Sequence, residues 1–338
     1  MKTKPNIIMK KLLSFSLIFV LCLLAVAGTP QTAHAKSKAK IHKIKTAADW
    51  NKISKYKGGT FKLTKNIKLS NKNKYLTISK NKKYTIDLNG HKVYTTYTGT
   101  QLRSVCPLVI NKGTVTIKDS SKKKKGVLYS TETVAITIGG KSKLYVKSGM
   151  IVNDAVEFRS NMPSGIIMTG KSKVYLQGSS KVRSIGNGIT MLTGSPSLFL
   201  TGHPYIRAGA NNFTGMFTHY GSGINVAAPG AKLSIKGGSI GTKASTDISY
   251  STIASTQSYV MSGDYPIYDK NGKTLKTAKG YKYVDAKGNT VSISNELDNI
   301  IPGASAYMSQ VAGFSGAKRL TTTTKSSDGF YTIYVVKK

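Results

Sequence analysis

Cysteine, tryptophan and acidic residues are scarce in this chain. Its 338 residues include two cysteines, one tryptophan and 13 aspartates and glutamates, against 51 lysines and arginines. Beyond the first 35 residues only Cys106 remains, so no disulfide can form within one chain and stability must come from packing and backbone hydrogen bonds. The shortage of acids also leaves little material for a calcium site or for a pair of catalytic carboxyl groups.

Patterns that hold metals or cofactors are also absent from the sequence. There is no zinc pattern, phosphate loop or dinucleotide fingerprint, and the histidines are scattered without metal-ligand spacing. The segment Gly237-Gly-Ser239-Ile-Gly241 matches G-x-S-x-G, but that motif has meaning only at a strand-to-helix turn of an α/β-hydrolase. We therefore expect a turn there, no metal site and no cofactor.

One long apolar run is present, and it lies at the start of the chain. Lysines at 2, 4, 10 and 11 precede an apolar stretch from Leu12 to about Ala27, and Ala33-His34-Ala35 follows it. This order is typical of a secretory signal peptide over 1–35, cleaved before Lys36. Cleavage removes four lysines and no acid, so the formal net charge falls from +38 to +34. No later run is long enough to cross a bilayer, and we expect a secreted, extracellular protein.

The positive charge is carried by lysine, with 46 lysines against five arginines. Lysine is a flexible, hydrated point charge, whereas arginine is a planar fork suited to bidentate recognition. A charge of this size favours association with polyanions in general and says little about the fold.

A short alternating pattern recurs along the middle of the chain: apolar, any residue, apolar, polar. The units begin at Phe61, Tyr84, Val115, Leu144, Val174, Leu198 and Leu233. A second short strand and a tight turn precede each later unit, as in Ile166–Met168 before Gly170, and a third strand often follows, as in Met150–Val152. Three strands in about 30 residues match one coil, and stacked coils pair their edges. We predict an all-β chain, a right-handed parallel β-helix of about seven coils.

The repeats divide the chain into four parts. After the signal peptide, 36–58 is predicted to be a basic leader, solvated over 36–46, followed by an N-terminal cap with a short helix over 47–56. The β-helix is expected over 59–246. Residues 247–338 are interpreted as a linker, over about 245–257, and a small C-terminal β-rich cap or module whose last strand is 331–336.

Three phrases resemble a known group of proteins. They are Thr85-Ile-Asp-Leu-Asn-Gly-His-Lys-Val93, Thr116-Ile-Lys-Asp-Ser120 and Lys147-Ser-Gly-Met-Ile151. Over roughly 59–245 the chain is similar to bacterial secreted and surface proteins with the pectin-lyase-like β-helix. The resemblance implies the fold but not an activity, since that group includes lyases, hydrolases and adhesins.

Outward-facing residues supply the candidate ligand-binding site. If the two apolar positions of each unit point inward, the residues between and beside them point outward and form columns across the coils. The candidate residues are Tyr145, Tyr175, Phe199, Lys143, Lys173 and Lys147. Sugar rings stack on aromatic faces, and lysines attract phosphate or carboxylate groups. The same aromatics could instead be ladder contacts that hold the coils in register.

Two functions of different classes follow from these columns and from the few acids. In the first, a secreted, cell-wall-associated protein binds an anionic polysaccharide or teichoic acid without catalysis, with extracellular DNA as a non-specific partner. In the alternative, a polysaccharide lyase or glycoside hydrolase acts on an acidic glycan, and the weak catalytic candidates are Asp154 and Glu157. A structural component without a discrete site is also compatible with the sequence. The ligand and the oligomeric state are left open.

Overall fold

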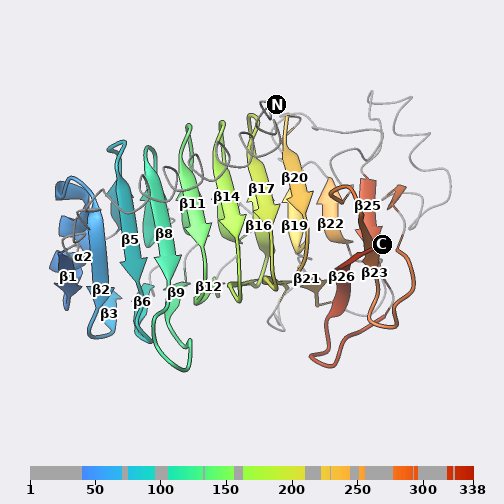
Figure 1. Cartoon of the computed structure of the whole chain (residues 1–338), viewed down its shortest axis with the longest axis horizontal. Helices are drawn as coiled ribbons and strands as arrows, with labels where there is room; N and C mark the ends of the chain where they lie inside the picture. Colours follow the sequence, from blue (N-terminus) through green and yellow to red (C-terminus); the bar gives the residue numbers. More distant parts are fainter. Residues whose placement is uncertain are drawn as a thin grey trace, which may run out of the picture. The chain divides into compact units, whose positions relative to one another are not determined.

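The described strands between residues 40 and 338 form three sheets, in which most pairings are parallel (Figure 1). The computed structural model describes residues 40–70, 75–95, 106–131, 134–155, 163–209, 222–228, 230–243, 251–255, 277–291, 293–295, 318–322 and 324–338. The predicted signal peptide lies outside these residues. Among the helices that are described, none is long and apolar enough to span a bilayer.

Each sheet collects one strand from every coil. Sheet A has the order β1 (Ile41–Ile44), β2 (Gly59–Leu63), β5 (Lys83–Asp87), β8 (Thr114–Lys118), β11 (Lys143–Val146), β14 (Lys173–Leu176), β17 (Ser197–Leu200) and β20 (Lys232–Ile235). Sheet B begins with β3 (Ile67–Leu69), β6 (Lys92–Thr95), β9 (Val127–Ser130), β12 (Met150–Asn153), β15 (Lys181–Ser184), β18 (Tyr205–Ala208) and β21 (Ser239–Thr242). Sheet C begins with β4 (Leu76–Ile78), β7 (Leu108–Ile110), β10 (Val134–Ile138), β13 (Ser164–Met168), β16 (Asn187–Met191), β19 (Ile224–Val226) and β22 (Ser251–Ser255).

The chain passes through sheets A, B and C in turn, from β2–β3–β4 to β20–β21–β22, and so completes seven coils. Every pairing between these coils is parallel, for example β11 with β14 and β12 with β15. The all-β parallel β-helix of about seven coils is therefore confirmed. The coil boundaries proposed at 58/59 and 246/247 stay predictions.

Alternation within each strand decides which side chains form the core. In β14, Val174 and Leu176 are fully buried, whereas Lys173 is exposed and Tyr175 is half-buried. Equivalent apolar residues of neighbouring coils lie in register, so the buried side chains form one continuous hydrophobic cluster along the stack. The first unit is an exception to the predicted alignment, because Phe61 pairs with Ile86 rather than with Tyr84.

The N-terminal end of the stack is covered by a helix and an extra strand. Helix α2 (Ala47–Lys52) and the 3-10 turn η1 (Ile53–Lys55) lie within the expected 47–56. The prediction of a solvated leader over 36–46 is wrong for β1, which pairs in parallel with β2 and buries Ile44. A lysine-rich composition concealed this strand, which satisfies the edge of β2.

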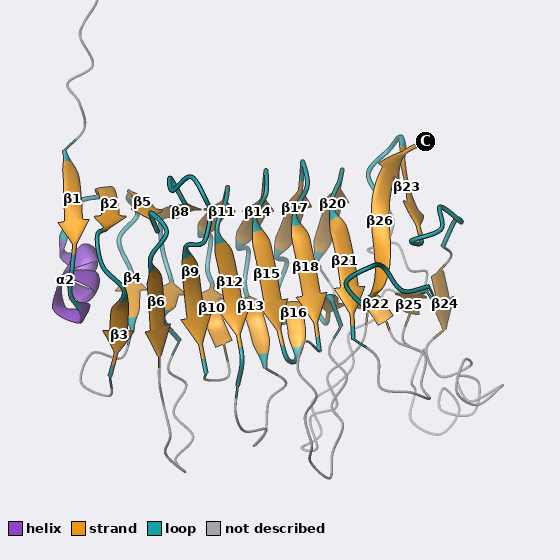
Figure 2. Cartoon of the chain, turned by 90° about the horizontal axis from the view of Figure 1, so that it is seen from below, coloured by secondary structure: helices purple, strands orange, loops and turns teal. Residues whose placement is uncertain are grey.

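At the C-terminal end the strands reverse direction. Strand β26 (Tyr331–Lys337), predicted as the last strand, runs antiparallel to β21 and pairs with β23 (Tyr281–Val284), as Figure 2 shows. In sheet C, β25 (Lys318–Thr321) pairs antiparallel with both β22 and β24 (Ile293–Asn295). Strand β22 itself lies inside the stretch interpreted as a linker and continues the parallel sheet from β19.

The one cysteine after the predicted signal peptide is a packing residue. Cys106 is buried, and its thiol donates hydrogen bonds to the carbonyl oxygens of Leu108 and Ala135. Burial raises the pKa of the Cys106 thiol to about 11, so the unreactive thiol form dominates at neutral pH.

Candidate functional site

The outer face of sheet A brings the predicted binding residues together. Strand pairing places Tyr145 beside Tyr175 and Tyr175 beside Phe199, and it places Lys143 beside Lys173. Lys147 directly follows β11, and its backbone N–H donates to the carbonyl of Ile117 in the preceding coil. Residues two apart on one strand, and their register partners on the neighbouring strands, thus lie on the same face of the sheet, as the alternating pattern requires.

The three aromatic rings form a continuous ladder. The ring centroids of Tyr145 and Tyr175 are 4.4 Å apart with planes 7° from parallel, and those of Tyr175 and Phe199 are 4.6 Å apart at 9°. Burial raises the pKa of the Tyr175 hydroxyl, and the neighbouring Tyr145 hydroxyl adds to this, so the group stays protonated at neutral pH. The half-buried Tyr175 therefore presents its ring edge and an uncharged hydroxyl group to solvent.

This geometry changes how a sugar could contact the ladder. Both faces of the Tyr175 ring are covered, one by Tyr145 and the other by Phe199. The expectation that sugar rings stack on aromatic faces therefore fails at Tyr175, where only the ring edge and the hydroxyl are accessible. The close stacking also makes the ladder a contact that holds the coils in register.

Lysines flank the ladder on both sides and carry uncompensated charge. Lys143, Lys147 and Lys173 are exposed. Between described residues, ion pairs involve only the cations Lys118, Arg183 and Arg207, and none involves these three lysines. Adjacent strands in a sheet are about 4.8 Å apart, so the ammonium groups of neighbouring coils repel one another unless an anion lies between them.

The described carboxyl groups have structural partners. They are those of Asp49, Asp87, Asp119, Asp154, Asp285 and Asp328. Asp49 accepts the N–H groups of Lys45 and Thr46 at the start of α2, and Asp285 accepts those of Lys287 and Asn289 in a turn. No group of three or more histidine, cysteine, aspartate or glutamate side chains in the described part of the chain could hold a metal ion.

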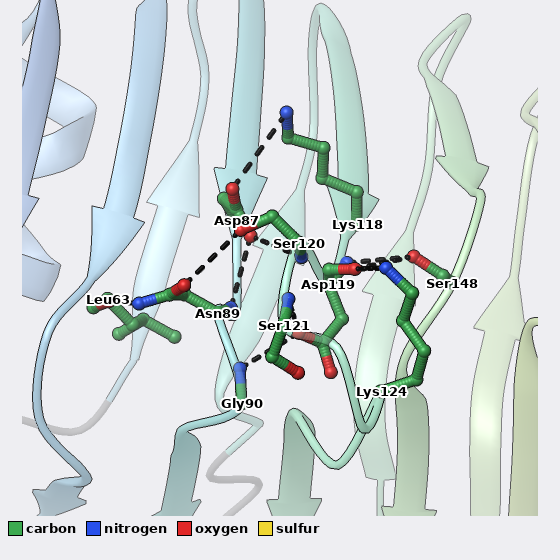
Figure 3. A network of polar contacts seen from close by, with 10 residues as sticks. All are labelled: Leu63, Asp87, Asn89, Gly90, Lys118, Asp119, Ser120, Ser121, Lys124 and Ser148. Atoms are coloured by element: carbon green, nitrogen blue, oxygen red, sulfur yellow. Dashed lines mark hydrogen bonds and ion pairs between the residues drawn. The ribbon is translucent and has the colours of Figure 1, made fainter.

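The turns from sheet A to sheet B contain two of these carboxylates (Figure 3). Asp87 accepts hydrogen bonds from the N–H groups of Asn89, at 3.1 Å, and Ser120, at 2.9 Å. Asp119 accepts from the N–H groups of Gly90, Ser121 and Gly126, which ties the turns of two coils together. These bonds give Asp87, Asn89 and Gly90 of the first phrase, and Asp119 of the second, a structural role in the turns.

Replacing Asp119 by asparagine should lower the free energy of unfolding by about 1–3 kcal/mol, because an amide NH₂ would face a buried backbone N–H. Burial raises the pKa of Asp119, but the N–H groups of Gly126, Ser121 and Gly90 outweigh it, and the net pKa is lowered. The carboxylate thus stabilises the fold above the ordinary value of 3.8, and this contribution is lost as the pH falls through the lowered pKa. Urea unfolding at pH 7 and pH 3 checks this, and an unchanged stability at pH 7 would contradict it.

Of the two candidate catalytic acids, the structure describes only Asp154. Asp154 forms an ion pair with Arg183, with 3.0 Å between the guanidinium nitrogen and the carboxylate oxygen. Glu157 lies outside the described residues. Asp154 lies beside sheet B, close to Tyr129 and Lys92, and away from the lysine columns of sheet A.

The turns from sheet C to sheet A contain further lysines, which the alternating strand pattern does not mark as site residues. Lys141 and Lys171 are exposed, and each stands two residues before a lysine of the candidate site. The sequence does indicate them, because the tetrapeptide Gly-Lys-Ser-Lys occurs at 140–143 and again at 170–173 and so places the two lysines at equivalent positions. The serines between the lysines, Ser142 and Ser172, are fully buried, so the lysines on either side point outward.

Comparison with known proteins adds no relative. No family model matches the chain, and no curated protein and no solved structure matches it. The assignment of the fold therefore depends on the strand pairing described above.

Proposed function

We propose that this chain is a secreted protein of the bacterial cell surface or wall that binds an anionic polymer without catalysis. Teichoic acid and acidic polysaccharides are the expected partners, and DNA is a non-specific one. The three phrases in the A-to-B turns support a relationship with the pectin-lyase-like group. The predicted signal peptide supports secretion, and the high positive charge supports retention at a polyanionic surface.

The observation that carries the proposal is the distribution of charge on sheet A. Lys143, Lys147 and Lys173 flank a stacked aromatic ladder and have no carboxylate partner among the described residues. The described aspartates are occupied in turns, a helix cap and ion pairs. A surface whose lysines lack carboxylate partners, in a protein whose described aspartates already accept hydrogen bonds or form ion pairs, suits binding of a polyanion better than acid–base chemistry.

The proposal predicts salt-sensitive binding that depends on these lysines. Lys143→Gln, Lys147→Gln and Lys173→Gln together should remove three ionic contacts. At 0.1 M salt we expect roughly a hundredfold loss of affinity and a reduction of about two in the slope of log affinity against log salt. Sedimentation of the protein without its first 35 residues on purified Gram-positive walls, over a salt series, measures both.

The ladder is tested separately, because a register contact and a ligand contact respond differently. Tyr145→Phe with Tyr175→Phe keeps the stacked rings and removes the two hydroxyl groups. Weaker binding at unchanged stability would assign a ligand contact to the hydroxyls. Failure of the unsubstituted protein to bind walls in a salt-dependent way would refute the proposed function.

A further inference from the structure

The turns that lead from sheet C into sheet A carry a second row of lysines. Lys112, Lys141 and Lys171 each stand two residues before the strand residues Thr114, Lys143 and Lys173, which are paired with one another. All three lysines of the row are exposed. Because coils repeat about every 4.8 Å, the row spans roughly 10 Å along the stack and runs beside Lys143 and Lys173.

The backbone of these turns is held in one conformation. Gly140 and Gly170 have φ values of +60° and +64°, and a Cβ atom at Gly170 would lie 3.1 Å from the backbone nitrogen of Gly140. The N–H of Lys143 donates to the carbonyl of Gly113, and that of Lys173 donates to the carbonyl of Ser142. Glycine is therefore required for the turns to stack closely, and the stacked turns hold the backbone atoms of the lysines in fixed positions.

In the turns from sheet A to sheet B, lysines have partners within the protein that this row lacks. Where sheet A passes into sheet B, Lys118 pairs with Asp87 at 3.8 Å, and the Asp119 carboxylate and carbonyl hold the loop that contains Lys124. No carboxylate of the described residues pairs with Lys112, Lys141 or Lys171. Like charges on neighbouring coils repel one another, so the row does not stabilise the fold through charge pairing.

The type of cation bears on how an anion is held. An arginine fork binds carboxylate or phosphate in one bidentate orientation, whereas a lysine ammonium is a point charge that binds phosphate groups without fixing their orientation, which suits a flexible phosphodiester chain. Arg183 and Arg207, on sheet B, are engaged with Asp154 and Asp328. The cations beside the aromatic ladder are lysines.

We propose that Lys112, Lys141 and Lys171, together with Lys143 and Lys173, form a binding track for a phosphodiester polymer that lies along the stack, across the strands. This rests on the proposed function and narrows it, from anionic polymers in general to phosphate-bearing chains, and from the face of sheet A to its border with sheet C. The polymer contacts successive coils, and one edge of the aromatic ladder lies beside it.

Two variants with equal loss of charge test the location of the track. The first carries Lys112→Gln, Lys141→Gln and Lys171→Gln. The control carries Lys122→Gln, Lys123→Gln and Lys125→Gln, which are exposed lysines of the A-to-B loop. Affinity is measured for synthetic poly(glycerol phosphate) and for polygalacturonate of matched length, from 50 to 300 mM salt, and circular dichroism confirms folding.

The track predicts roughly a hundredfold weaker binding of poly(glycerol phosphate) for the first variant at 0.1 M salt, and a salt slope lower by about two. The control should lose less than tenfold, and Lys141→Arg with Lys171→Arg should retain binding. Equal losses in both triple variants, or a larger loss in the control, would overturn the track. Tighter binding of polygalacturonate would overturn the phosphate assignment. If the unsubstituted protein binds neither polymer, the proposed function fails with it.

Discussion

Replacing Asp328 by asparagine is expected to lower the free energy of unfolding by about 3 kcal/mol, since it leaves a buried guanidinium without its counter-charge. The Arg207 side chain is 3% exposed, and its Nη2 and Nε lie 2.8 and 2.9 Å from Oδ2 of Asp328. The guanidinium also lies 3.9 Å above the Tyr205 ring, and the Tyr205 hydroxyl donates to the same carboxylate oxygen. This pair joins the turn before β26 to β18.

A second arginine–aspartate pair on the same sheet provides the control. Arg183 is the register partner of Arg207 on the adjacent strand, but its side chain is 40% exposed. Asp154→Asn should therefore cost about 1 kcal/mol or less. Urea unfolding of both variants makes the comparison, and an equal effect would show that burial of Arg207 is not the reason. The same Asp154 variant should bind polymer normally.

Acid should release the Arg207–Asp328 contact. Burial raises the pKa of Asp328, but the Ser326 hydroxyl and the Arg207 guanidinium outweigh it, so the pKa lies below its ordinary value of 3.8. The pair therefore stabilises the fold above that value and loses its contribution as the pH falls through the lowered pKa. The difference in stability between the unsubstituted protein and Asp328→Asn should shrink between pH 5 and pH 2.

Trp50→Ala is expected to be the most damaging change at the other end of the stack, with a loss of about 3–5 kcal/mol. Trp50 is fully buried, and its Nε1 donates to the carbonyl of Pro107 at 3.2 Å. It lies in α2, whose start is closed by a capping box between Thr46 and Asp49. The substitution removes the anchor of the helix that covers the first coils and leaves strand edges unprotected.

Two measurements check the effect of Trp50. Thermal unfolding by circular dichroism should show the loss of stability, and sedimentation velocity should show association that grows with protein concentration. Lys52→Ala, on an exposed position of the same helix, should change stability by less than about 0.5 kcal/mol. A monomeric Trp50→Ala protein of normal stability would show that the helix is not needed as a cover.

Where the structure departs from the sequence-based predictions, the contacts are long-range. Strand β1 was concealed by the lysine-rich segment around it, and it exists because the edge of β2 needs a partner. The ion pair of Arg207 with Asp328 joins residues 121 positions apart, one on β18 and the other in the turn before β26. No local pattern encodes such a pairing, since it depends on how the chain returns after the last coil.

Sequence alone was enough for the β-helix and for the columns of outward residues. An alternating unit such as Val174-Tyr-Leu176 determines which side chains are buried, and its repetition determines which residues become neighbours. The scarcity of acidic residues in the sequence already counted against a metal-dependent enzyme. Only the tertiary structure decided how the described aspartates are used and that Lys141 and Lys171 join the candidate site. It also decided that the Tyr175 ring has no free face, because hydrogen bonds and stacking between coils depend on three-dimensional register rather than on composition.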